Sequence, residues 1–292
     1  MYKNNPIVFV LASVLVSTTL YAQDENNELS DPEWIEEANR VIVYKPENKK
    51  YLLKSENLYN QSSKFDLYHP NTDVKSPVVI LIHGGPVPNT LKTKPKDWGF
   101  FTSYGQAIAK SGFAAITFNH SLHKLTSFPE SHREIDALIS HIRVNSSELN
   151  VDKDNIILWF FSGSGALMAP FFNEQPKFIK GIIGFYPLLN LTPYKDNLFQ
   201  VNAHDILNRY TPEQTLSSGL SIPIFIARAE LDSKDINDAI DSFVEKADSV
   251  GVNVILHNNT KGRHGFDNDL GESEADTIKI IRSAIEFIGK QT

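Results

Sequence analysis

The amino-acid sequence predicts an α/β fold, in which a mostly parallel central sheet is covered by helices on both faces. Two observations lead to this prediction. Continuous apolar runs without polar alternation are typical of strands buried on both faces, and here they cover residues 78–82, 113–118, 156–161, 182–186, 224–227 and 252–256. Stretches with helical patterning separate most of these runs, as parallel strands require; they cover residues 101–111, 131–145, 164–173, 235–250 and 273–289.

The first 22 residues are expected to be a secretory signal peptide rather than part of this fold. Lys3 precedes an apolar run over residues 7–20, and Ala22 is followed by acidic residues, which is the layout of such a signal. The run is shorter than the ~20 apolar residues that a membrane span needs. We therefore expect an exported chain, periplasmic or secreted, with no stable membrane span after cleavage behind Ala22.

Residues 23–292 are expected to fold as a single α/β domain, because neither an internal repeat nor a low-complexity linker divides them. Residues 23–60 are its N-terminal arm and extra strands. Short β-type runs parted by polar loops predict an antiparallel start to the sheet. These runs cover residues 41–44, 51–53 and 65–68.

Charge and cysteine content exclude several classes of function. The chain has 28 Lys and Arg against 35 Asp and Glu, a formal net charge of −7, and no basic run. Binding to nucleic acid is not expected, because that mode needs clustered positive charge. The chain has no cysteine, which rules out disulfides, a thiolate nucleophile and Cys-ligated zinc.

Candidate site residues should follow the strands, because parallel sheets bind ligands beyond the carboxyl ends of their strands. After residues 156–161 comes Ser162-Gly163-Ser164-Gly165. A serine in a sharp strand-to-helix turn exposes its hydroxyl, and small neighbours permit the turn. Ser162 is favoured because it ends the strand directly. Ser164 stays as the alternative nucleophile, and a simple helix N-cap is the structural alternative for the whole motif.

A glycine-rich loop, His83-Gly84-Gly85-Pro86, follows residues 78–82. Glycines let backbone amides approach a ligand, and such amides stabilise an oxyanion. Pro86 has no N–H. Gly85 is therefore the first candidate donor and Gly84 the second, while an ordinary turn is the structural alternative.

Two further residues end later loops. Asp232 precedes the helix expected at 235–250 and could orient an imidazole, although taken by itself its position favours capping that helix. Glu230 is the alternative acid. His264 lies in the last loop before the last predicted helix. Ser162, Asp232 and His264 thus occur in the order nucleophile, acid, base.

Over about residues 60–292 these motifs resemble the α/β-hydrolase fold, specifically the dienelactone-hydrolase and prolyl-oligopeptidase-like serine esterases. The loop at 83–86 resembles the oxyanion loop, and residues 155–165, 228–232 and 264–266 resemble the nucleophile, acid and base segments. The resemblance implies that Ser162 is the nucleophile, Asp232 the acid and His264 the base, with oxyanion donors Gly85 and Gly163 and no metal or cofactor. Phe160 departs from the family, which usually has a small residue there.

The expected function is hydrolysis of a carboxylic ester, with a small-molecule or saccharide ester as substrate. Trp98 and His120 are candidate substrate contacts, and packing is the alternative role for both. An aminopeptidase or amidase on the same triad is one rival. The other is a catalytically silent binding protein, an alternative that rests on the large side chain of Phe160.

Overall fold

The structure is a computed structural model that describes residues 36, 38–198, 202–268 and 271–292. In this part of the chain, eight strands form one sheet in the order β1-β2-β4-β3-β5-β6-β7-β8. β1 and β2 are antiparallel and β2 runs antiparallel to β4, whereas the pairs from β4 through β3 to β8 are parallel. The strands are β1 (Tyr51–Leu58), β2 (Lys64–Pro70), β3 (Ser76–Ile82), β4 (Ala114–Phe118), β5 (Val151–Phe161), β6 (Ile179–Phe185), β7 (Ile224–Ala229) and β8 (Val254–Asn259). The predicted α/β fold with a mostly parallel sheet is confirmed.

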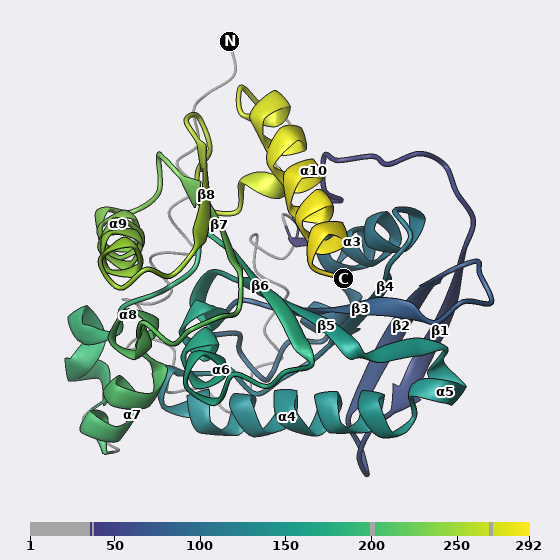
Figure 1. The fold of residues 1–292 in the computed structure, drawn as a ribbon, viewed down its shortest axis with the longest axis horizontal. Helices are drawn as coiled ribbons and strands as arrows, with labels where there is room; N and C mark the ends of the chain where they lie inside the picture. The colour runs from purple at the N-terminus through teal and green to yellow at the C-terminus, as the bar shows by residue number, and fades with distance from the viewer. Residues whose placement is uncertain (1–35, 37, 199–201, 269–270) are drawn as a thin grey trace.

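Helices cover both faces of the sheet (Figure 1). The helices are α3 (Gly99–Lys110), α4 (Phe128–Val144), α5 (Ser146–Leu149), α6 (Met168–Glu174), α7 (Ala203–Tyr210), α8 (Pro212–Thr215), α9 (Lys234–Ser249) and α10 (Glu274–Gln291). Buried residues of α3 and α10 share one hydrophobic core, and those of α4, α6 and α9 share the core on the opposite face.

Most of the continuous apolar runs are explained by this layering, but in the run at 252–256 Ile255 and Leu256 are exposed, because β8 is an edge strand. In β3, Val78 and Ile80 belong to the core under α4, whereas Val79 and Leu81 belong to the core under α3. Successive side chains of a strand point to opposite faces, so both sets must be apolar when helices cover both faces.

One predicted strand is wrong. Residues 41–44 do not join the sheet, although Ile42 and Val43 are buried. The amide of Ile42 donates to Ser103 Oγ at 3.0 Å, and that of Val43 donates to the carbonyl of Asp267 at 2.9 Å. The segment is apolar because it packs beside α3. It pairs with a side chain and a loop rather than with a strand.

The predicted helices are present, with boundaries moved by a few residues. The one expected at 164–173 begins as a 3-10 turn, η4 (Ser162–Leu167), and continues as α6. The signal peptide expected at 1–22 lies outside the described residues. Within the described ranges, no helix combines the length and the hydropathy of a membrane span.

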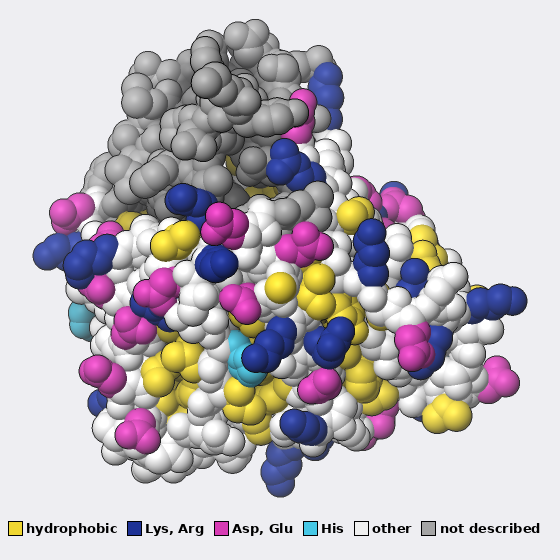
Figure 2. Space-filling view, turned by 90° about the horizontal axis from the view of Figure 1, so that it is seen from above, with side chains coloured by type: hydrophobic (Ala, Val, Ile, Leu, Met, Phe, Trp, Pro, Cys, Tyr) yellow, Lys and Arg dark blue, Asp and Glu magenta, His cyan; other side chains and the backbone are white. Residues whose placement is uncertain are grey.

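Surface charge is mixed on the face that Figure 2 shows. Lys and Arg side chains are interspersed there with Asp and Glu side chains. Over the described part of this face, positive charge is not gathered into the continuous patch that a phosphate backbone would need.

Candidate active site

A strained turn presents Ser162 at the carboxyl end of β5. Its φ of +53° lies in the left-handed region, which costs a residue with a side chain on the order of 1–3 kcal/mol. The next residue has to be glycine, since a Cβ on Gly163 would lie 1.9 Å from the carbonyl oxygen of Gly85. A Cβ on Gly165 would lie 2.6 Å from the amide nitrogen of Leu188. The small residues seen in the sequence are therefore a requirement of the turn.

The structure brings Ser162, His264 and Asp232 together. Ser162 Oγ lies 2.7 Å from His264 Nε2, and His264 Nδ1 lies 2.6 Å from Asp232 Oδ2. The Asp232 side chain is only 1% exposed, so water does not compete for the imidazole. With the proton on Nδ1, the imidazole donates to the carboxylate, and Nε2 can accept the serine proton. The arrangement is suited to making a nucleophile of Ser162.

Ser164, the alternative nucleophile, is fully buried. Its Oγ lies 2.9 Å from the carbonyl oxygen of Ile82 and 2.8 Å from that of Phe161, and it accepts the Phe161 amide at 3.0 Å. The hydroxyl of Ser164 therefore holds the end of β5 against β3, and it does not face the cavity described below.

The residue that caps α9 is not the residue that contacts His264. Ser233, rather than Asp232, caps α9, accepting the amide of Ile236 at 3.4 Å. The side chain of Glu230, the alternative acid, is 45% exposed and pairs with Arg228 at 2.6 Å. The carboxylate bonded to His264 is that of Asp232.

Phe160, which stands where the family usually has a small residue, does not line the cavity beside Ser162. It is fully buried in the core under α4 and α6, with its ring centroid 6.2 Å from that of Phe171. The next strand residue, Phe161, points to the other face and lines the cavity. The size of Phe160 is therefore accommodated by the core.

A cavity of about 100 Å³ opens beside Ser162 and His264. Four aromatic side chains form part of its wall: Trp98, Phe100, Phe101 and Phe161. Trp98 thus lies where a substrate contact was predicted. It also packs as part of the core, since it is 6% exposed and donates from Nε1 to the carbonyl of Thr93 at 3.1 Å. Trp98 therefore lines the cavity and also packs in the core.

The glycine-rich loop runs alongside the serine. A Cβ on Gly84 would lie 2.9 Å from Ser162 Cβ, and Gly84 and Gly85 both line the cavity. Gly163 packs against Gly85, whose backbone nitrogen would lie 3.4 Å from a Cβ built on Gly163. The two backbones expected to supply oxyanion donors are therefore adjacent to each other and to Ser162.

His120 is not brought to this cavity. Its ring stacks on that of His83, with centroids 3.7 Å apart and planes 13° apart, and its Nε2 lies 3.0 Å from the His83 carbonyl oxygen. Burial lowers the pKa of His83 to about 4 and the pKa of His120 well below its usual range. Two neutral rings can stack without repulsion. His120 therefore packs against His83 and lines a different cavity, with Asn119 and Ser121.

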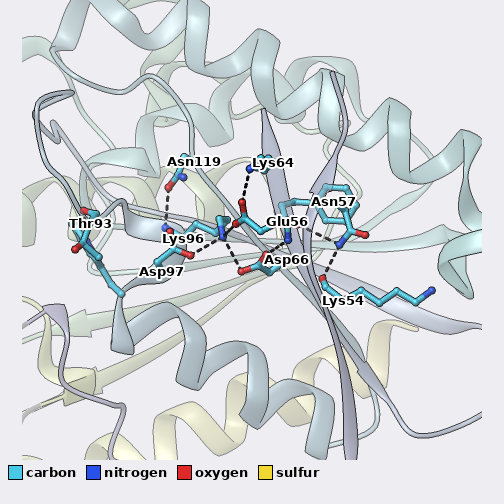
Figure 3. A network of polar contacts seen from close by, with 11 residues as sticks. Lys54, Glu56, Asn57, Lys64, Asp66, Thr93, Lys96, Asp97 and Asn119 are labelled. Atoms are coloured by element: carbon cyan, nitrogen blue, oxygen red, sulfur yellow. Dashed lines mark hydrogen bonds and ion pairs between the residues drawn. The ribbon is translucent and has the colours of Figure 1, made fainter. Parts of the chain in front are cut away.

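Among the described residues, one acidic group has the spacing of metal ligands: Glu56, Asp66 and Asp97. The Lys96 ammonium lies among them, 2.7, 2.9 and 2.6 Å from their oxygens in that order (Figure 3). Lysine thus supplies the positive charge that a metal would otherwise bring. The cluster ties the β1–β2 hairpin to η2 (Pro95–Asp97), next to Trp98 in the cavity wall.

Two residues around His264 were not predicted from the sequence. Tyr186 lines the cavity and packs on the His264 ring at 4.6 Å, and its hydroxyl donates to the buried Asp267 at 2.7 Å. Tyr186 directly follows β6, so the rule that sites gather at the carboxyl ends of strands could have found it. The sequence carries no comparable signal for Asp267.

The fold of this chain is similar to that of several solved structures. One is a truncated form of a carbohydrate esterase from gut microbiota, with a TM-score of 0.67 and 16% identity over 84% of this chain and 98% of that one. Another is an inhibited esterase B from Lactobacillus rhamnosis, with a TM-score of 0.67 and 17% identity over 88% and 92%. A third is the butyrate-bound esterase Est2 of Thermogutta terrifontis, with a TM-score of 0.63 and 17% identity over 84% and 95%.

No curated protein matches the chain in sequence. The family model BD-FAE matches residues 65–214, which is 150 of the 292 residues and includes the glycine-rich loop and the serine elbow. With its sheet order and its elbow geometry, the chain has the α/β-hydrolase fold and belongs to the BD-FAE family.

Proposed function

We propose that this protein is a serine esterase that hydrolyses a carboxylic ester through an acyl-enzyme. The hydrogen-bonded chain from Ser162 through His264 to Asp232, at the mouth of an apolar cavity, carries this proposal. The three similar structures are esterases by name, which supports the same class of reaction.

In the first half of the reaction, His264 Nε2 takes the hydroxyl proton as Ser162 Oγ attacks the ester carbonyl carbon. The carbonyl oxygen becomes an oxyanion, for which Gly85 and Gly163 are the proposed amide donors. When the tetrahedral species collapses, the alcohol leaves with the proton from His264. Water then repeats the sequence on the acyl-serine and releases the acid.

Asp232 is proposed to hold the proton of the imidazole on Nδ1 and to stabilise the positive charge that forms on it. Its short contact with His264 and its near-complete burial support this role. A buried carboxylate interacts with the imidazolium more strongly than an exposed one would, because water screens it less.

The small aromatic cavity supports a short acyl group, with the alcohol of a small-molecule or saccharide ester directed outward. The expected signal segment supports a place of action outside the cytoplasm, either periplasmic or secreted. The proposed transfer of the acyl group to water needs no cofactor.

Labelling with a fluorophosphonate and a chain-length series of aryl esters test the proposed function together. We expect covalent labelling at Ser162 and highest kcat/KM for the shortest acyl groups. Absence of both labelling and turnover would support the silent binding protein. Faster cleavage of aminoacyl amides than of esters would support the amidase.

Turnover is expected to be lower in mildly acidic than in neutral solution. The reason is that His264 must be neutral to accept the serine proton, so the protonated form at low pH is inactive. The measurement is kcat/KM for an aryl acetate against pH, under conditions in which chemistry limits the rate. A flat profile across this range would contradict the role of His264.

Phe101→Leu is expected to move the acyl preference toward longer chains. Phe101 is buried in the cavity wall, and shortening it adds space where the acyl group is proposed to lie. The ratio of kcat/KM for hexanoyl to acetyl esters should rise roughly tenfold, the range that one or two methylenes are worth in an apolar pocket. Phe243→Leu, the same change in α9 on the opposite face, is the control and should leave this ratio unchanged.

A further inference from the structure

A fully buried carboxyl group lies next to the proposed base. Asp267 belongs to η6 (Phe266–Asn268), three residues after His264, and it has no solvent exposure. Its two carboxyl oxygens accept hydrogen bonds from the hydroxyls of Tyr104, at 2.5 Å, and Tyr186, at 2.7 Å. Neither partner carries a positive charge. Burying an acid without a cation costs free energy that an apolar residue would not cost, so packing alone does not account for it.

Tyr186 connects this acid to the base. Its ring packs on the imidazole of His264, with centroids 4.6 Å apart and planes at 55°. Its φ of +39° lies in the left-handed region, and its amide donates to the carbonyl of Ala227 at 2.7 Å. The ring is thus held by its backbone at one end and by Asp267 at the other. A ring held in this way restricts where the imidazole can lie.

Asp267 is itself held by three separate segments. Tyr104 comes from α3 and Tyr186 from the end of β6, while the amide of Val43 in the N-terminal arm donates to the Asp267 carbonyl at 2.9 Å. These contacts fix the loop that carries His264 to α3, to the end of β6 and to the N-terminal arm. The loop therefore has an anchor in addition to the bond to Asp232.

We propose, on the basis of the proposed function, that Asp267 is a positioning residue for His264. Through Tyr186 it keeps the His264 ring between Ser162 and Asp232. Its buried negative charge also favours the imidazolium that forms during the reaction. The effect on the ring is steric and the effect on the charge is electrostatic, so they can be measured separately.

The groups that face Asp267 set its charge. Burial raises the pKa of Asp267 to about 6, while hydrogen bonds from Tyr104 and Tyr186 and the charge of His264 act in the opposite direction. Asp232 is a further negative charge close enough to act on Tyr186. Above about pH 6, Asp267 is ionised in the folded protein, and its charge then attracts a proton on His264.

The electrostatic part is tested by following the His264 imidazole with ¹⁵N NMR during a pH titration of the wild type and of Asp267→Asn. The asparagine keeps the size of the side chain and removes the charge. We expect the titration midpoint of His264 to be lower in Asp267→Asn than in the wild type, because a nearby negative charge favours the charged form of the imidazole. An unchanged midpoint would overturn this part. The readout does not require activity, so it decides the inference even if the proposed function fails.

The steric part is tested by comparing Tyr186→Phe with Tyr104→Phe. Each variant removes one hydrogen bond to the same carboxyl group, but only Tyr186 packs on His264, and Tyr104 does not line the cavity. We expect kcat for an aryl ester to fall roughly tenfold in Tyr186→Phe with KM nearly unchanged, because misplacement of a reacting group is costly. In Tyr104→Phe the loss should stay under about threefold, with a similar fall in Tm.

Equal losses of kcat in the two tyrosine variants would mean that the network only stabilises the fold, and would overturn the steric part. Tyrosine variants also keep the inference testable if Asp267→Asn does not fold. A wild-type protein that is neither labelled by fluorophosphonate nor active would sink the proposed function alone, because the NMR titration still reports on Asp267 and His264.

Discussion

Ser162→Ala is expected to lower kcat for aryl esters by roughly 10⁶-fold, the loss seen when the serine of a comparable triad is removed. Without Oγ no acyl-enzyme forms, and only the cavity and the oxyanion donors remain to act on the substrate. The elbow conformation should survive, because alanine is smaller than serine and meets no new neighbour. The measurement is single-turnover kinetics together with fluorophosphonate labelling, which should disappear.

Ser164→Ala is the matched control, since it makes the same change two residues away. Its buried hydroxyl bonds to backbone groups of β3 and β5, so the variant should lose about 1–2 kcal/mol of folding stability while keeping most of its turnover. If Ser164→Ala abolished labelling and Ser162→Ala did not, the assignment of the nucleophile would be reversed.

Asp232→Asn is expected to lower turnover by about 10⁴-fold, as the corresponding change does in another triad. The neutral amide no longer holds the proton of the imidazole on Nδ1, so Nε2 cannot accept the serine proton. Asp232 does not cap α9, because Ser233 does, and the helix should therefore be unaffected. Turnover and Tm of this single variant separate loss of chemistry from loss of fold.

Glu230→Gln is the control for this prediction. Its carboxylate is exposed and pairs with Arg228 at the surface, where ion pairs contribute little. Turnover should stay within about twofold of the wild type. An unchanged rate in Asp232→Asn combined with a large loss in Glu230→Gln would move the acid role to Glu230.

The layered fold and the order of the site motifs follow from the amino-acid pattern. Runs such as residues 78–82 are apolar on successive positions because helices cover both faces of the strand, and the amino-acid pattern alone shows this. The carboxyl ends of parallel strands meet at one edge, so Ser162, Asp232 and His264 could be expected to converge although up to 102 positions separate them.

Residues that look alike in sequence are distinguished by their surroundings in the folded chain. Ser162 and Ser164 differ because one lies in a left-handed turn beside a cavity and the other is buried against backbone carbonyls. The same holds for the apolar run at 41–44, which is buried by α3 rather than by a neighbouring strand. The local sequence pattern indicates that a side chain is buried. Which residues pack against it depends on segments that are distant in the chain.

Asp267 is another residue whose contacts could not be predicted from the local sequence. An aspartate three residues after a histidine forms no distinctive local motif. The hydrogen bonds of Asp267 come from Tyr104 and Tyr186, which lie 163 and 81 positions away along the chain. Hydrogen bonds act over about 3 Å of space whatever the separation in sequence. The identity of such partners is therefore determined only when the sheet and its helices have brought those segments together.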